Sequence, residues 1–462
     1  MNSLVCLLDD REVGRVVRAR GRLTFTYADS WLRTPGAYPL SLSMPLAAGK
    51  QGHSAIEPFL WGLLPDNALV LRRWAQMFHV SPQNLFGLVA AVGEDCAGAV
   101  QFMTPERFDA LQREEAPRVS WLSEEEVAAR LRVLRQDGSA GRTTADLGQF
   151  SLAGAQPKTA LLFDGQRWGI PAGRTPTTHI LKPTTAEFDG HAENEHICMA
   201  LARSLGLPTA TTQVLTFEEV TAIAVERYDR VDTRQLAASA AARTAAAADA
   251  AAAQDAAVMA QFSRKTPFYR VHQEDLCQAL GLHPSKKYQN EGGPSPQAIV
   301  SLLRSTIAGQ AAQADVTTFI RFLAFNWIVG GTDAHSKNVS LLLGSDGVVR
   351  LAPFYDIASI YAYPHIDPRK AKLAMKIGDT YRIDDVSWRK WAALAKDLRL
   401  PADQVIDEVR EMARGLPAAL AEEVRIARTK GLEHPVLDRL SHQLVERAAH
   451  VSASLGRHRA ND

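Results

Sequence analysis

The sequence has few cysteines and no clustered metal ligands. Its four cysteines, at positions 6, 96, 198 and 277, are far apart and form no C-x-x-C pair. This spacing argues against a zinc site and against a disulfide framework, and no run rich in histidine and cysteine indicates another transition metal. Widely spaced reduced thiols are typical of cytosolic proteins, so we expect a cytoplasmic location.

Long hydrophobic runs and an excess of one charge are also absent. No apolar stretch approaches the ~20 residues of a membrane-spanning helix, so we expect no membrane association. The N-terminal sequence MNSLVCLLDDRE has a short apolar run closed by two acids, which predicts a first β-strand rather than a signal peptide. The 52 lysines and arginines nearly balance the 51 acids, for a net charge of +1. This balance argues against a protein that binds nucleic acid strongly on its own.

The chain of 462 residues is long enough for two or three domains or for one large two-lobed enzyme. Apolar patterns and turn residues divide it into segments of different character. These are a small α+β domain at 1–105, a polar connector at 106–145, a strand-rich nucleotide-binding part at 146–234, an Ala-rich insertion at 235–260, and a mostly helical C-terminal lobe at 261–462.

Two local predictions inside these segments concern helix boundaries. In the connector, Ser123 followed by three glutamates predicts a capped helix. Near the C-terminus, Pro401, Gly415-Leu416-Pro417 and Gly431 predict breaks between several amphipathic helices.

The most informative motif is Asp333-x-x-x-x-Asn338, which follows an apolar segment, with Asp356 after the next short strand. An acid, an asparagine five residues later and a second acid after a strand is the order used by kinase-type phosphotransferases. There the first acid accepts or orients the proton of the attacking hydroxyl, and the other two residues hold Mg²⁺ against the ATP phosphates. The spacing alone is common by chance. The apolar flanks make it informative, because burying a carboxylate is costly unless a metal or donor satisfies it.

Further candidates precede this loop in the order that a kinase requires. The small residues of Ser151–Lys158 could let backbone N–H groups approach phosphate oxygens. Lys182 ends an apolar strand and could reach the phosphates, and either Glu193 or Glu195 on the following helix could hold it. The strand end at 224–230 could offer main-chain groups to adenine. Taken singly, these features are also an ordinary β-turn, a solvated lysine and a charged turn.

His335 lies two residues after Asp333 and has three readings. The three interpretations are that His335 contacts phosphate, that it orients Asp333, and that it caps the loop.

Together these residues resemble the HipA family of bacterial serine/threonine kinases, the toxin half of HipBA toxin–antitoxin modules. The resemblance covers nearly the whole chain, and its motifs are long and stand in the family's order. They are GLLPDN, GEDCAGAVQF, SLAGAQ-K-TALL, THILK, ENE, AVERYDR, HQEDLCQALG, KYQNEGGP, GGTDAHSKNVS, LAPFYDI and KLAM. The expected fold is α+β, a two-lobed protein-kinase-like fold with an N-terminal α+β subdomain and a mostly helical C-terminal lobe.

The resemblance also implies a role for each candidate. Asp333 would be the catalytic acid, and Asn338 and Asp356 would hold Mg²⁺. Ser151 matches the serine that the family autophosphorylates, a modification that expels the phosphate-covering loop and switches the kinase off. Contacts to ATP would come from Ala153, Gly154, Ala155, Gln156, Pro157, Lys158, Lys182, Glu226, Tyr228, His335, Lys337, Asn338, Tyr355 and Asp356.

Substrate and partners follow from the same resemblance. The family phosphorylates aminoacyl-tRNA synthetases, glutamyl-tRNA synthetase most prominently, and so inhibits translation. Its partner is HipB, a small helix-turn-helix antitoxin that binds operator DNA. A near-neutral toxin fits DNA binding mainly through that partner.

Two departures from the family pattern stand out. Pro157 replaces a residue that is often Glu, and the Ala-rich stretch at 235–260 is longer than the usual connection. Neither departure removes a catalytic group. Two other functions stay open: a small-molecule kinase of the same fold, and a non-catalytic regulator that binds an antitoxin and DNA.

Overall fold

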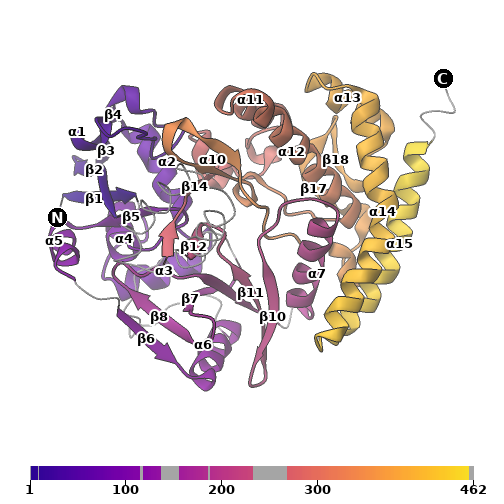
Figure 1. The fold of residues 1–462 in the computed structure, drawn as a ribbon, viewed down its shortest axis with the longest axis horizontal. Coiled ribbons are helices and arrows are strands. Elements are labelled where there is room, and N and C mark those ends of the chain that lie inside the picture. The colour runs from indigo at the N-terminus through magenta and orange to yellow at the C-terminus, as the bar shows by residue number, and fades with distance from the viewer. Residues whose placement is uncertain are drawn as a thin grey trace, which may run out of the picture.

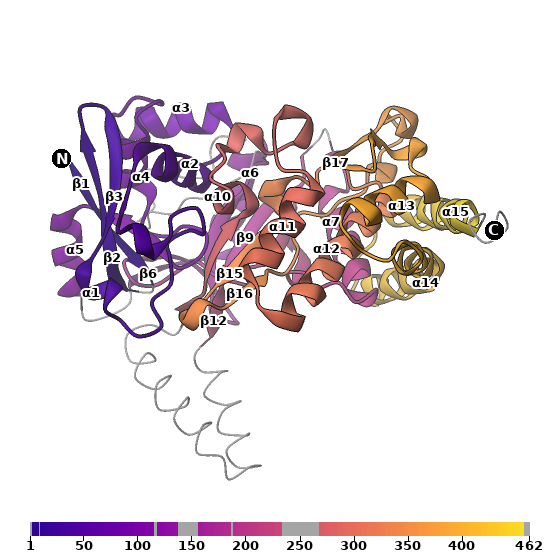
Figure 2. The same ribbon diagram turned by 90° about the horizontal axis from the view of Figure 1, so that it is seen from above.

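The computed structural model describes residues 2–8, 10–114, 118–136, 156–185, 188–232 and 268–456. In Figures 1 and 2 the chain runs from an N-terminal sheet at one end, through a second set of strands, to a helical region at the other end. The predicted loop residues 151–155 and the Ala-rich stretch at 235–260 lie outside the described residues.

The N-terminal unit is a five-stranded antiparallel sheet with strand order β4-β3-β2-β1-β5. Its strands are β1 (Ser3–Leu8), β2 (Arg11–Ala19), β3 (Arg22–Tyr27), β4 (Lys50–Gln51) and β5 (Val100–Met103). A turn at Gly21 joins β2 to β3, and Gly21 adopts a φ of 74° there, a conformation that suits glycine. The helices that follow are α1 (Asp29–Leu32), α2 (His53–Leu63), α3 (Ala68–Met77) and α4 (Leu85–Val92).

A six-stranded antiparallel sheet forms the second unit, with strand order β10-β11-β9-β7-β8-β6. Its strands are β6 (Arg118–Leu122), β7 (Thr159–Phe163), β8 (Trp168–Ala172), β9 (His179–Pro183), β10 (Thr212–Phe217) and β11 (Val220–Glu226). Alternate residues of β11 face opposite sides. Ala222 and Ala224 pack in the same cluster as α6 (Glu124–Gln136). Ile223 and Val225 belong to the main core, together with α7 (His191–Ser204).

Part of the predicted polar connector is folded into this second unit. Of the stretch at 106–145, most of α5 (Pro105–Gln112) packs on the N-terminal unit, where Leu111 shares a cluster with Val5 and Met103, and β6 and α6 follow in the second unit. Strand β6 pairs with β8 at the sheet edge, and α6 begins as expected, because Ser123 Oγ accepts from the N–H of Glu126 at 3.2 Å. The polar composition of residues 118–136 reflects an edge strand and a half-exposed helix.

The C-terminal lobe is mostly helical, as expected. Its helices are α10 (Leu276–Ala279), α11 (Pro296–Thr306), α12 (Gly309–Val329), α13 (Trp388–Asp397), α14 (Ala402–Thr429) and α15 (Pro435–Gly456). A hairpin of β15 (Ser340–Leu343) and β16 (Val349–Leu351) is extended to three strands by β14 (His272–Asp275). Two further antiparallel pairs are β12 (Arg230–Asp232) with β13 (Phe268–Arg270), and β17 (Lys372–Ile377) with β18 (Thr380–Arg382).

The break predicted at Gly415-Leu416-Pro417 is wrong. Helix α14 runs unbroken for 28 residues with Pro417 inside it. Leu416 and Leu420 are buried on either side of the proline. The apolar face that α14 packs against α15 therefore outweighs the local cost of the missing N–H.

Candidate active site

A cavity of about 830 Å³ lies where the second sheet meets the C-terminal lobe. Its wall also includes Gly62, Asp66 and Ala97 of the N-terminal unit. The sequence candidates that line it are Gln156, Pro157, Lys158, Lys182, Glu195, Glu226, Tyr228, Asp333, His335, Lys337, Asn338, Tyr355 and Asp356. Of the candidates among the described residues, only Glu193 is not part of this wall. Ser151, Ala153, Gly154 and Ala155 lie outside the described residues.

Helix α12 leads directly into the Asp333 loop. The helix is buried along most of its length, including Phe325 and Trp327, because its sequence is apolar on nearly every face. It ends at Gly330, whose φ is 69° and where a Cβ would lie 2.6 Å from the Tyr361 ring. The close approach requires glycine at this position, and it turns the chain sharply into the loop.

The Asp333 loop is held by its own backbone and by Asn338. The carbonyl oxygen of Asp333 accepts from the N–H of His335 at 2.8 Å and from Nδ2 of Asn338 at 2.9 Å. Because the Asn338 nitrogen is used in this way, its Oδ1 atom is the side-chain acceptor for a ligand.

The carboxylate of Asp333 is the exposed end of this arrangement. Its side chain is 59% exposed, and Oδ1 lies 3.8 Å from Nε2 of His335. The hydroxyl of Tyr288 donates a hydrogen bond to the same oxygen. Burial lowers the pKa of His335, so its imidazole is neutral at neutral pH. The structure thus places the His335 ring beside the Asp333 carboxylate.

Lys182 is held between two carboxylates. Its Nζ atom lies 2.8 Å from Oε1 of Glu195 on α7 and 2.7 Å from Oδ1 of Asp356. Glu195, not Glu193, is therefore the acid of α7 that contacts this lysine. Burial would raise the pKa of Asp356, but the ammonium groups of Lys182 and Lys158 outweigh it and hold that pKa far below its ordinary value. Asp356 is consequently an anion that faces the cavity.

Two tyrosines pack together between the hinge candidate and the hairpin. The Tyr228 and Tyr355 rings are stacked with centroids 5.9 Å apart, and the Tyr355 hydroxyl donates to the carbonyl of Lys337 at 2.8 Å. The N–H of Glu226 donates to the carbonyl of Thr211 at 2.9 Å. A hinge contact to adenine from Glu226 must therefore use another of its groups.

Lys337 lines the cavity, but its ammonium is directed to the N-terminal unit. Nζ lies 3.2 Å from the carbonyl oxygen of Gly62 and 3.1 Å from Oδ1 of Asp66. The side chain is 2% exposed. In this structure the ammonium of Lys337 therefore contacts the N-terminal unit.

The donor set suits a magnesium ion that is shared with phosphate. Asn338 and Asp356 supply an amide and a carboxylate oxygen, which are hard ligands. In the described part of the chain, no group of three or more His, Cys, Asp or Glu could hold a metal by itself. Mg²⁺ commonly takes one or two protein ligands and completes its shell with water and substrate phosphates, so these residues fit that ion.

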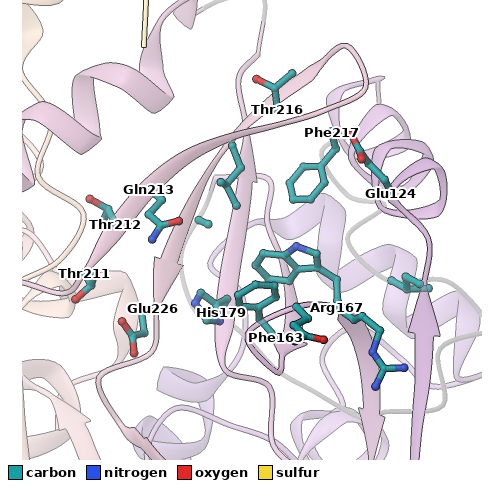
Figure 3. Close-up of a pocket in the computed structure, with 15 residues that line it drawn as sticks. Glu124, Phe163, Arg167, His179, Thr211, Thr212, Gln213, Thr216, Phe217 and Glu226 are labelled. Atoms are coloured by element: carbon teal, nitrogen blue, oxygen red, sulfur yellow. The ribbon is translucent and has the colours of Figure 1, made fainter. Parts of the chain in front are cut away.

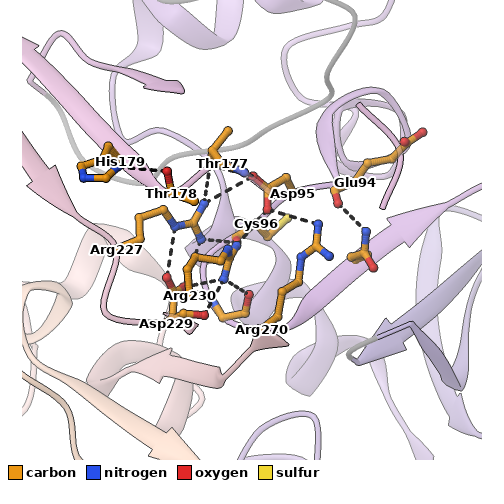
Figure 4. Close-up of polar contacts among 12 residues, drawn as sticks. Glu94, Asp95, Cys96, Thr177, Thr178, His179, Arg227, Asp229, Arg230 and Arg270 are labelled. Atoms are coloured by element: carbon orange, nitrogen blue, oxygen red, sulfur yellow. Dashed lines mark hydrogen bonds and ion pairs between the residues drawn. The ribbon is translucent and has the colours of Figure 1, made fainter. Parts of the chain in front are cut away.

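Asp95 of the N-terminal unit lies in a buried ionic cluster (Figure 4). Its carboxylate lies 2.8 Å from Arg230 and 3.4 Å from Arg227, and it accepts from the N–H of Thr177 at 2.9 Å. Asp229 pairs with the same two arginines. Burial would raise the pKa of Asp95, but the guanidinium groups outweigh it and lower that pKa. The cluster joins the GEDCAG turn to the hinge candidate.

A second cavity, of about 390 Å³, lies against strands of the second sheet and borders α6 (Figure 3). Phe163 and Trp168 stack there at 4.5 Å, and Trp168 meets His179 edge-on at 5.3 Å. Burial lowers the pKa of His179 to about 4, which leaves it neutral at neutral pH. Of the described candidates, Glu226 borders both cavities. The site residues predicted from the sequence thus gather around the first cavity.

A helix that spans a membrane must be both long and apolar. Among the helices of the described residues, none combines the length and the apolar composition that crossing a bilayer requires.

Sequence comparison finds relatives along most of the chain. Residues 4–103 match the HipA N-terminal domain, and residues 150–420 match the HipA-like C-terminal domain. A Sinorhizobium fredii protein named putative kinase Y4mE is 34% identical over 391 residues, which cover 84% of each chain. The serine/threonine-protein kinase toxin HipA of Shewanella oneidensis is 29% identical over 409 residues, covering 86% of this chain and 83% of that protein.

Structural comparison gives the same relationship. The structure of Shewanella oneidensis HipA with HipB and its operator DNA matches 98% of this chain and 98% of that one, with a TM-score of 0.79 and 25% identity. This likeness confirms the predicted α+β, two-lobed fold class.

Proposed function

This chain belongs to the HipA family, and on that premise we propose that it is an ATP- and Mg²⁺-dependent serine/threonine protein kinase. The observation that carries the proposal is that Lys182, Asp333 and Asp356, from separate stretches of the chain, line one cavity of about 830 Å³. Phosphoryl transfer requires positioning and charge stabilisation more than covalent chemistry. A paired lysine, an amide and two carboxylates provide both.

The nucleotide side of the site is built on Lys182. Glu195 holds its ammonium in place, ready for the phosphates, and Lys158 adds a second ammonium. Glu226 and Tyr228 form the hinge for adenine. When bound, Mg²⁺ neutralises charge on the phosphate oxygens, with Asn338 and Asp356 as its protein ligands.

The acceptor side is built on Asp333. Its exposed carboxylate is accessible to a serine or threonine hydroxyl of another protein. As the hydroxyl oxygen attacks the γ-phosphorus, the hydroxyl proton moves to Asp333 and ADP leaves.

Ser151 is the proposed autophosphorylation site and off switch. A phosphate there adds about −1.5 to −2 of charge at neutral pH, shortly before Gln156 in the sequence, which lines the cavity. The modified loop and the nucleotide then cannot occupy the site together.

The proposed biological role is that of the toxin of a type II toxin–antitoxin module in the cytoplasm. Its substrate is an aminoacyl-tRNA synthetase, glutamyl-tRNA synthetase by family resemblance, and its phosphorylation inhibits translation. A HipB-like helix-turn-helix antitoxin is the partner and supplies most of the affinity for operator DNA. The likeness to a HipA that was solved with HipB and operator DNA supports this assignment.

Purified full-length protein with Mg²⁺ and [γ-³²P]ATP tests the proposal. We expect label on Ser151 and on an added synthetase, and complete loss of both in Asp333→Ala. Asp438→Ala is the matched control, because Asp438 is 76% exposed and pairs with Arg428 at the surface, a contact worth about 1 kcal/mol or less.

The two other functions predict different results. A labelled small molecule without labelled protein would favour a small-molecule kinase. Full growth inhibition by Asp333→Ala in cells would favour a non-catalytic regulator.

A further inference from the structure

The N-terminal unit reaches the cavity through Asp66, which lies in the turn between α2 and α3. Its two carboxylate oxygens contact different segments of the C-terminal lobe. Oδ1 lies 3.1 Å from Nζ of Lys337, and Oδ2 lies 3.0 Å from Nζ of Lys287. The side chains of Asp66 and the two lysines are 13%, 2% and 17% exposed. Water and salt therefore screen these ion pairs weakly.

Each lysine precedes a group of the proposed site. Lys337 precedes Asn338, and Lys287 precedes Tyr288, whose hydroxyl donates to Asp333. The two segments are also bonded to each other, because the carbonyl of Lys287 accepts from the Oγ and the N–H of Ser336, at 2.8 and 3.2 Å.

Backbone groups of the N-terminal unit complete the contact. The carbonyl oxygen of Gly62, at the end of α2, accepts from Nζ of Lys337 at 3.2 Å. A Cβ on Gly62 would lie 2.7 Å from the Gln278 side chain, so glycine allows α2 to approach this closely.

The charges at this contact are fixed at neutral pH. Burial would lower the pKa of Lys337, but the carboxylates of Asp275 and Asp66 outweigh it and raise that pKa. Burial would raise the pKa of Asp66, but Lys337 and Lys287 outweigh it and lower that pKa. One carboxylate thus holds an ammonium group on each of its two oxygens.

We propose that Asp66 is a positioning residue for phosphoryl transfer. Through Lys287 and Lys337, the N-terminal unit holds the segments that place Asp333 and Asn338. The inference rests on the proposed kinase function and extends it. It gives the GLLPDN motif a role in turnover rather than in nucleotide affinity, which Lys182 and the hinge provide.

The matched comparison is Asp10, which joins the N-terminal unit to a different part of the chain, the second unit. Its Oδ2 lies 3.0 Å from Nη1 of Arg174, with the Asp10 side chain 23% exposed. Asp10 is not part of the cavity wall. Asp10→Asn therefore removes an ion pair between the N-terminal unit and the second unit without touching the site.

The experiment compares Asp66→Asn with Asp10→Asn in the full-length protein. Incorporation of phosphate from Mg²⁺-[γ-³²P]ATP is followed over a range of ATP concentrations. For Asp66→Asn we expect the maximal rate to fall by about tenfold or more, with half-saturating ATP within about twofold of wild type. For Asp10→Asn we expect the maximal rate and the half-saturating ATP concentration to stay within about twofold of wild type. Lys287→Gln, which leaves the Asp66–Lys337 pair intact, should give an intermediate loss of rate.

Hydrogen exchange of the 333–338 amides, measured without nucleotide, tests the positioning role of Asp66 independently of the proposed kinase activity. We expect faster exchange there in Asp66→Asn and Lys287→Gln, but not in Asp10→Asn. If wild type incorporates no phosphate, the kinase assignment fails and exchange alone decides the inference. The positioning role of Asp66 would be overturned if the 333–338 amides of Asp66→Asn exchanged as slowly as those of wild type. Equal rates of phosphate transfer in Asp66→Asn and Asp10→Asn would also overturn it. If Asp66→Asn does not fold, the same criteria apply to Lys287→Gln.

Discussion

The hydroxyl of Tyr288 donates a hydrogen bond to Oδ1 of Asp333. The Tyr288 ring also meets the His335 ring edge-on, with centroids 5.0 Å apart. Burial raises the pKa of Tyr288, and the adjacent carboxylate raises it further, so the hydroxyl stays protonated and remains a donor. An otherwise exposed carboxylate is thereby held in one orientation.

Tyr288→Phe should slow phosphate transfer while leaving ATP binding intact. The ring remains, but the donor to Asp333 is lost. A hydrogen bond to a charged group contributes about 1.5–3 kcal/mol, which corresponds to a loss of about tenfold or more in rate. The measurement is the rate of phosphate incorporation together with a separate ATP titration. Tyr381→Phe is the control, because Tyr381 lies outside the cavity wall. A variant that loses ATP affinity instead would place Tyr288 on the nucleotide side.

Glu195→Gln should weaken both ATP binding and phosphate transfer. The change keeps the size of the side chain but removes the charge that lies 2.8 Å from Lys182. Lys182 is then left with Asp356 as its acidic partner, and we expect a loss of about tenfold or more in ATP affinity. Calorimetric titration with ATP measures this change.

Glu193→Gln is the matched control for that change. Glu193 is buried on the same helix but does not line the cavity. We expect ATP affinity within about twofold of wild type. Equal losses in the two variants would mean that helix packing, rather than the contact with Lys182, is the cause.

The sequence contains enough information to predict the charged residues that meet at the cavity. Lys182, Asp333 and Asp356 each follow an apolar segment, and such segments form the strands and helices of the core. Their side chains therefore emerge where buried elements end, which is where sites gather in this kind of fold. The pattern could not choose between Glu193 and Glu195, because both lie on one helix and only the packed structure shows which one contacts Lys182.

The sequence does not indicate the residues that join the domains. Asp66 and Lys287 are separated by 221 positions, and neither stands out by periodicity, which reports only on near neighbours. Tyr288 likewise stands in a polar stretch that gives no sign of its contact with Asp333. The KYQNEGGP and GLLPDN motifs were the available signals, but the sequence of a motif does not show which residues it contacts. Those contacts are known only from the folded structure.

ATP affinity should fall as the pH rises through about 8. Burial and the nearby ammonium of Lys182 lower the pKa of Lys158 to about 8, so its charge is present below that pH and lost above it. Bound phosphates favour the protonated form, and deprotonation therefore weakens binding by up to about tenfold per pH unit.

Lys158→Arg should remove this pH dependence, because a guanidinium stays protonated throughout the range. The measurement is a series of ATP titrations between about pH 7 and pH 9, with wild type and variant in the same buffers. A flat wild-type curve would show that Lys158 makes no charge contact with the nucleotide.

Asp95→Asn should destabilise the whole chain. The change removes a buried negative charge that lies within 4 Å of Arg227, Arg230 and Arg270, at 3.4, 2.8 and 3.7 Å. Breaking a buried ion pair by neutralising one partner costs about 3–5 kcal/mol, because the remaining charge is left without compensation. Urea unfolding of the full-length protein measures the loss as a lower midpoint. Glu12→Gln is the control, because its partner Arg15 is 49% exposed and such surface pairs contribute about 1 kcal/mol or less. If the two curves coincide, Asp229 alone is sufficient to balance the arginines, and the GEDCAG turn does not stabilise the hinge.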